Sequence, residues 1–109
     1  MAFDESLAAR IRLVLSKRKG LEEKKMFGGI AFMINGNVCC GVLKDDLLLR
    51  LAPEETEQAV SEPHVRPFAM GGRTMKGWIM IAPDGVKTDE KLSAWVRRGA
   101  GFASSLPKK

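Results

Sequence analysis

The sequence predicts an α+β fold: a two-layer sandwich in which helices pack on one face of an antiparallel β-meander, in the order α-β-β-β-α-β-α. Three observations lead to this prediction. An amphipathic helical pattern opens the chain, short apolar segments with hairpin signals between them follow, and a second helical pattern closes it. The 109 residues, 45% of them hydrophobic and 28% charged, suit a single domain over residues 1–109.

The first helix is predicted from its apolar spacing. One stripe recurs at steps of three and four residues: Phe3, Leu7, Ile11, Val14 and Leu15. Asp4 is the expected N-cap, and Gly20 is expected to end the helix. The basic residues 17–19 suit the negative end of the helix dipole.

The β-meander is predicted over residues 29–34, 38–43 and 47–51. Asn35-Gly36 is a strong hairpin signal between the first two strands, and residues 44–46 turn the chain again. If Asp45-Asp46 forms the second two-residue turn, the register follows. The expected pairs are Phe32 with Cys39, Ile30 with Gly41, and Gly41 with Arg50.

Both faces of this predicted sheet are apolar. One face is expected to carry Ala31, Met33, Val38, Cys40, Val42, Leu47, Leu49 and Leu51, and it must lie under helices. The opposite face is expected to carry Ile30, Phe32, Cys39, Gly41, Leu43, Leu48 and Arg50. Such a face needs a second covering layer or contact with another molecule.

The second half of the chain supplies two more helices and a strand. A short helix is expected to begin at Pro53 and to end before Pro63. Residues 64–72 are predicted to be irregular, residues 74–82 to form a strand, and residues 83–85 to turn. Thr88 is the expected N-cap of the last helix, with an apolar stripe at Leu92, Trp95, Val96 and Phe102.

Charge and cysteine usage favour a cytoplasmic protein. The net charge of +5 suggests attraction to polyanions. The basic residues are, however, spread over several segments, so the sequence does not indicate an element dedicated to recognising a groove of nucleic acid. The acidic N-terminus and the lack of a long apolar run give no sign of a signal peptide or membrane span.

Adjacent Cys39 and Cys40 are expected on opposite strand faces as small hydrophobes in a reducing compartment. With the single His64 they are too few for a four-ligand zinc site, so no metal is expected.

Catalytic signatures are lacking, and the sequence predicts a non-enzymatic protein without a cofactor. His64 stands between Pro63 and Val65, and no serine or cysteine has a nucleophile-elbow context. The chain has no phosphate-binding glycine loop, dinucleotide fingerprint or calcium loop.

Two glycine-bounded signatures are the main candidates for a functional surface: residues 24–29 (KKMFGG) and residues 72–78 (GRTMKGW). Their glycines could serve only turns and close approaches, and their large apolar side chains could be ordinary core. Methionine, aromatic and arginine residues together are, however, the types enriched at interfaces. The candidate interaction residues are Lys25, Met26, Phe27, Gly28, Gly29, Arg50, Arg73, Met75, Lys76, Gly77 and Trp78.

At these residues the chain resembles the N-terminal domain family of TfoX, the bacterial regulator of natural competence. The resemblance rests on residues 25–29, on the hairpin at 33–36 that leads to residues 40–42, and on residues 73–78. It implies an α+β domain with an antiparallel sheet, similar to secretion-chaperone-like folds. Full-length TfoX proteins promote expression of competence genes and carry a helical C-terminal domain, which we do not expect in this chain. The family offers no catalytic residues to carry over.

Three hypotheses about function remain open from the sequence. The first is a regulatory module that binds a protein partner or a second copy of itself. The second is a nucleic-acid-binding accessory protein in transcription regulation, motivated by the positive charge. The third is a small-ligand sensor in which Arg73, Lys76 and Trp78 surround a pocket.

Overall fold

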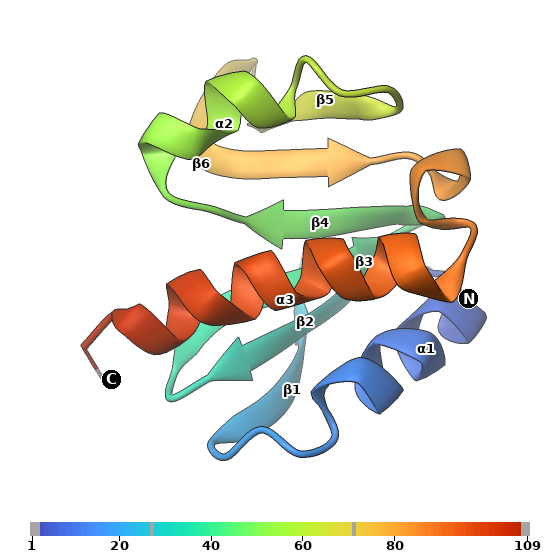
Figure 1. Cartoon of the computed structure of the whole chain (residues 1–109), viewed down its shortest axis with the longest axis vertical. Coiled ribbons are helices and arrows are strands. Elements are labelled where there is room, and N and C mark those ends of the chain that lie inside the picture. Colours follow the sequence, from blue (N-terminus) through green and yellow to red (C-terminus); the bar gives the residue numbers. More distant parts are fainter. Residues whose placement is uncertain (1–2, 27, 71, 108–109) are drawn as a thin grey trace.

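The computed structural model describes residues 3–26, 28–70 and 72–107 and confirms the α+β prediction, with helices on one face of an antiparallel sheet (Figure 1). The helices are α1 (Glu5–Leu15), α2 (Pro53–Ala59) and α3 (Asp89–Ser105), with a short 3₁₀ helix, η1 (Pro83–Val86). The strands are β1 (Leu21–Met26), β2 (Gly29–Ile34), β3 (Asn37–Leu43), β4 (Asp46–Arg50), β5 (Val65–Met70) and β6 (Arg73–Ile81). They lie in the order β1-β2-β3-β4-β6-β5.

The edge strands β1 and β5 are the elements that the sequence prediction missed, so the described order is α-β-β-β-β-α-β-β-α. β1 carries four charged residues in succession, at positions 22–25, and β5 contains Pro67. Charges and proline keep a sheet edge from pairing with another chain. The same residues remove the apolar alternation by which a strand is recognised in a sequence.

Both predicted N-caps are confirmed. The Asp4 carboxylate accepts hydrogen bonds from the backbone N–H groups of Ser6 and Leu7, at 2.9 and 3.2 Å. The Thr88 hydroxyl accepts one from the N–H of Lys91 at 3.2 Å. The predicted end of the first helix is wrong, because α1 stops at Leu15 and the chain turns into β1.

A β-bulge changes the predicted register between β2 and β3. Met33 pairs with Val38 as expected, but Phe32 pairs with Cys40 instead of Cys39. Cys39 is therefore the extra residue of the bulge. By the same one-residue shift, Ile30 pairs with Val42 and not with Gly41.

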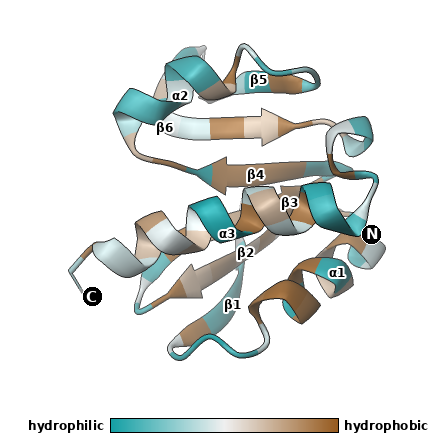
Figure 2. Cartoon of the chain, in the orientation of Figure 1, coloured by the Kyte–Doolittle hydropathy of each residue, from teal (hydrophilic) through white to brown (hydrophobic). Residues whose placement is uncertain are grey.

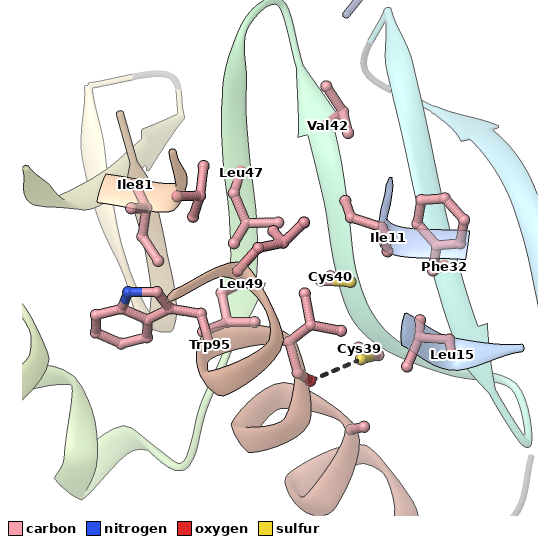
Figure 3. Close-up of a cluster of buried hydrophobic side chains, with 14 of the residues drawn as sticks. Ile11, Leu15, Phe32, Cys39, Cys40, Val42, Leu47, Leu49, Ile81 and Trp95 are labelled. Atoms are coloured by element: carbon pink, nitrogen blue, oxygen red, sulfur yellow. Dashed lines mark hydrogen bonds between the residues drawn. The ribbon is translucent and has the colours of Figure 1, made fainter. Parts of the chain in front are cut away.

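The bulge reverses which face each β2 residue occupies. Ile30 and Phe32 join the core under the helices, whereas the sequence placed them on the opposite face. Cys39 and Cys40 both belong to this core (Figure 3), so the prediction that they point to opposite faces is also wrong. The Cys39 thiol contacts the Val96 carbonyl oxygen at 3.9 Å.

The turn between β3 and β4 lies one residue earlier than predicted. Leu43 pairs with Asp46, leaving Lys44, at a φ of 55°, and Asp45 in the turn. Gly41 consequently pairs with Leu48 and not with Arg50. A shift of two residues preserves the alternation of faces, so the predicted faces of β4 are correct.

One core joins all three helices to the sheet. α3 lies in front of β3 and packs against β3 and β4 (Figures 1 and 2). Its helical members include Leu7, Ile11, Leu15, Ala59, Leu92, Trp95 and Val96. Gly99 allows the close approach of α3, because a Cβ there would lie 2.7 Å from the Cys39 carbonyl oxygen. The helices thus cover only one face of the sheet.

Candidate interaction surfaces

The two glycine-bounded signatures lie at diagonally opposite corners of the sheet. Residues 24–29 form the β1–β2 hairpin at one edge, and residues 72–78 belong to the β5–β6 hairpin at the other edge. Because every neighbouring pair of strands is antiparallel, the two hairpin turns also lie at opposite ends of the strands. The structure therefore does not bring the two signatures into one surface.

In the first signature the glycines have structural causes. Gly28 adopts a φ of 76° in the turn, and a Cβ on buried Gly29 would overlap the Val42 carbonyl oxygen. Lys25 is exposed on β1. Met26 ends that strand, but its side chain, like the whole of Phe27, lies outside the described residues.

The second signature forms a ribbon that extends past the end of β4. The β4–β6 pairing stops at Arg50 and Trp78, whereas β6 begins at Arg73. Arg73, Met75 and Lys76 are exposed, Met75 at 39%. Gly77, at a φ of 86°, is buried where the ribbon leaves the sheet, and its carbonyl oxygen accepts a hydrogen bond from Leu51.

Arg50 and Trp78, two of the predicted residues, are brought together. The Arg50 guanidinium carbon lies 5.5 Å from the ring centroid of Trp78 and 5.5 Å from that of Phe102 on α3. Phe68 on β5 also lies near Trp78, with its ring centroid 6.3 Å from that of Trp78. Arg50 thus ties the sheet to the last turns of α3 through cation–π contacts.

The sheet face without helices is covered by its own side chains. Leu48, Phe68 and Met80 are 2%, 9% and 6% exposed, and Leu43 and Trp78 pack against them. Arg66 crosses this face to Asp46 with an N–O distance of 2.6 Å. This face accordingly offers little open apolar surface. Its own side chains account for its burial, without the covering layer or second molecule that we expected from the sequence.

The most exposed large hydrophobic residue of the described chain is Leu13, at 76%. It borders a hollow of about 440 Å³ between α1 and α3, which we call the α1–α3 groove and which Arg10, Val14, Leu92, Ser93 and Arg97 also line. The end of α1 that flanks the groove is coloured as hydrophobic in Figure 2. Leu13 was not among the residues selected from the sequence. The signal that could have found it is that Leu13 is apolar but lies outside the predicted apolar stripe of the first helix.

The charged rim of the α1–α3 groove is partly neutralised. Arg10 donates hydrogen bonds to the Val86 carbonyl oxygen at 2.9 Å and to the Asp89 carboxylate at 3.2 Å. Arg97 forms no ion pair with any described residue. The groove therefore combines an apolar edge with an excess of positive charge.

Three side chains elsewhere have shifted pKa values: Arg12, Glu23 and Cys40. Arg12 and Glu23 form a bidentate pair at 2.7 and 2.8 Å, and this hydrogen bonding raises the pKa of Arg12 and lowers the pKa of Glu23. The hydrogen bond with Cys39, together with burial, raises the pKa of the Cys40 thiol well above its ordinary value. A raised pKa disfavours the thiolate, so Cys40 lacks the depressed pKa that thiol reactivity requires.

A family model, the TfoX N-terminal domain, matches residues 14–103. The chain belongs to the TfoX N-terminal domain family. This confirms the resemblance drawn from the sequence, and the match covers both signatures, the last two residues of α1 and most of α3. Comparisons with curated proteins and with solved structures found no match.

Membrane-spanning helices and metal-ligand clusters are both lacking among the described residues. Within residues 3–26, 28–70 and 72–107, no helix has both the length and the apolar character needed to cross a membrane. The same stretches bring together no group of three or more His, Cys, Asp or Glu side chains able to hold a metal ion.

Proposed function

We propose that this TfoX N-terminal domain is a non-enzymatic regulatory module that binds a protein partner through the α1–α3 groove. The observation that carries the proposal is the 76% exposure of Leu13 beside a hollow between two helices. A single exposed leucine is ordinary on a protein surface. A leucine at the rim of an interhelical hollow with Val14 and Leu92 resembles the anchor points that receive an amphipathic helix.

The charge of the groove indicates the chemistry of the partner. Arg10 and Arg97 lie on its two sides, and Asp89, its acidic residue, is already bonded to Arg10. Complementarity then favours an acidic segment, because opposite charge speeds encounter and sets orientation. We expect a helix with apolar residues three and four positions apart and with Asp or Glu beside them.

Peptide display tests the proposal for a partner whose sequence is unknown. A random peptide library is selected on the wild-type chain, and selected peptides are measured by fluorescence anisotropy. We expect acidic peptides with helical apolar spacing. Leu13→Ala should weaken their binding at least tenfold, or about 1.4 kcal/mol. Since Leu13 is exposed and alanine favours helix, the variant should remain folded.

Met75→Ala is the matched control, because Met75 is the other exposed large hydrophobic residue of the described chain, on the β5–β6 ribbon. It should leave peptide binding unchanged. Equal binding by both variants, or selection of basic peptides, would contradict the proposal. A mass that rises with concentration for the wild type but not for Leu13→Ala would assign the groove to a second copy of the chain.

Nucleic acid is a second candidate partner, favoured by the basic β5–β6 hairpin. Residues 63–83 contain three Arg or Lys residues and no acid. The exposed basic loop 17–19 lies at the same end of the sheet, because the Gly20 carbonyl accepts a hydrogen bond from Asn35 in the β2–β3 turn. Binding to duplex DNA should then fall steeply with salt and weaken in Arg73→Gln. Absence of binding at low salt would end this candidate.

A further inference from the structure

A second hollow, of about 470 Å³, lies on the other side of α3, between that helix, η1 and residues 62–64. Its volume falls within the range of small-molecule sites, roughly 300–1,000 Å³. It shares no lining residue with the α1–α3 groove. An inference about it therefore goes beyond the proposed function.

The side chains around this hollow are mostly cationic or able to donate hydrogen bonds. Lys91 and Arg98 stand seven residues apart on one side of α3, and His64 faces them from the loop before β5. The acidic member is Glu62, whose carboxylate lies 3.6 Å from the Arg98 guanidinium. Both partners are substantially exposed, at 50% and 39%, so this pair binds weakly and leaves a surplus of positive charge.

The Arg98 guanidinium is held in place by an aromatic ring. Its central carbon lies 4.8 Å from the centroid of Trp95, whose side chain is anchored in the core (Figure 3). A guanidinium stacked on a fixed ring has lost much of its rotamer freedom before any ligand arrives. Its planar fork is then ready to bind two oxygens of one anionic group.

The opposite wall is also held firmly. His64 adopts a φ of 68°, a left-handed conformation that side chains other than glycine seldom take. Its carbonyl oxygen accepts a hydrogen bond from Ala82 at 2.8 Å. A Cβ on Gly85 would lie 3.1 Å from the His64 Cβ and 2.6 Å from Ile81 Cγ2, so the loop packs against η1 without room to spare. Strained backbone that its surroundings enforce occurs often at ligand sites.

We propose that this hollow binds a small ligand through an anionic oxygen group, a phosphate or a carboxylate, held by Arg98 and Lys91 with His64 at its edge. Arg98 supplies the oriented pair of N–H donors, Lys91 supplies a second positive charge, and His64 borders the hollow on the opposite wall. The domain then has one surface for a partner and a separate site for a small anion, on opposite sides of α3.

Nuclear magnetic resonance of the ¹⁵N-labelled full chain tests the proposal. The chain is titrated with inorganic phosphate and, separately, with acetate, while chloride keeps the ionic strength constant. We expect saturable shifts at the Trp95 indole N–H and at the amides of His64 and Lys91. Tighter binding of one anion identifies the group that the site prefers. Lys91→Gln and Arg98→Gln should each weaken binding at least tenfold.

Arg97→Gln is the matched control, because Arg97 is the neighbouring cation on α3 but lines the α1–α3 groove. It should leave the anion titration unchanged. Shifts that never saturate, that spread equally over the basic residues, or that persist in Lys91→Gln would overturn the proposal. Lys91 is exposed, so loss of fold does not confound that variant. The two proposals can fail independently, since peptide binding depends on Leu13 and anion binding on Arg98.

Discussion

Replacing Gly99 by alanine tests how closely α3 packs on the sheet. In an exposed helix the change stabilises by about 1 kcal/mol through helix propensity. At this position, however, the new Cβ would lie 2.6 Å from Leu49 Cδ1 and 2.7 Å from the Cys39 carbonyl oxygen. The Leu49 side chain is fully buried and the carbonyl belongs to β3, so neither yields without disturbing the core. Such overpacking costs roughly 2–3 kcal/mol, leaving a net loss of about 1–2 kcal/mol.

Gly101→Ala on the same helix is the control. Gly101 is exposed, and a Cβ there meets nothing within 4 Å. We expect this variant to gain about 1 kcal/mol, so the two substitutions should change stability in opposite directions. Urea unfolding followed by circular dichroism measures both. Stabilisation by alanine at both positions would refute the inferred contact between α3 and β3.

Three further predictions follow from individual contacts. Arg50→Ala should lower the free energy of unfolding by about 1–2 kcal/mol in urea titrations, because it removes the cation shared by two aromatic rings, and an unchanged value would make those contacts incidental. The pKa of Glu23 is lower in the folded than in the unfolded chain, so its pairing with Arg12 stabilises above the ordinary pKa of 4.5 and is lost as the pH falls through the folded value. The stability difference between the wild type and Glu23→Gln should therefore shrink in acid; a constant difference would contradict this, and exposure of the pair limits it to below about 1 kcal/mol. Cys39 and Cys40 should react slowly with a thiol reagent in the native protein and rapidly in denaturant, whereas fast native labelling would show that the core opens.

The parts of the fold that could be predicted from sequence are those whose signals are local. Asp4 and Thr88 are capping residues at the start of apolar periodic segments, and both cap as expected. The Asn35-Gly36 hairpin also forms where predicted. The bulge at Cys39 has no such local signal, because its cause is the packing of both cysteines under α3. Edge strand β1 was not predicted, because its charged residues face solvent and give no alternation of apolar and polar residues.

The candidate site was predicted less well than the fold, for a related reason. The sequence selected Arg50 and Trp78 as candidates for contact with a partner but did not predict that they contact each other, as they do in the structure. Whether two segments share a surface depends instead on strand order and direction, which separate the two glycine signatures. Both hollows beside α3 arise between elements distant in sequence, so no motif marks them.

The most direct test of the proposed function is to map where a selected acidic peptide binds, by amide chemical shifts of the ¹⁵N-labelled chain. We predict that the largest shifts fall in the second half of α1 and in the first turns of α3, around Leu13 and Arg97. Shifts concentrated in the β5–β6 ribbon around Arg73 and Met75 would contradict this account. Such shifts would instead place the partner-binding surface on the residues that the sequence indicated.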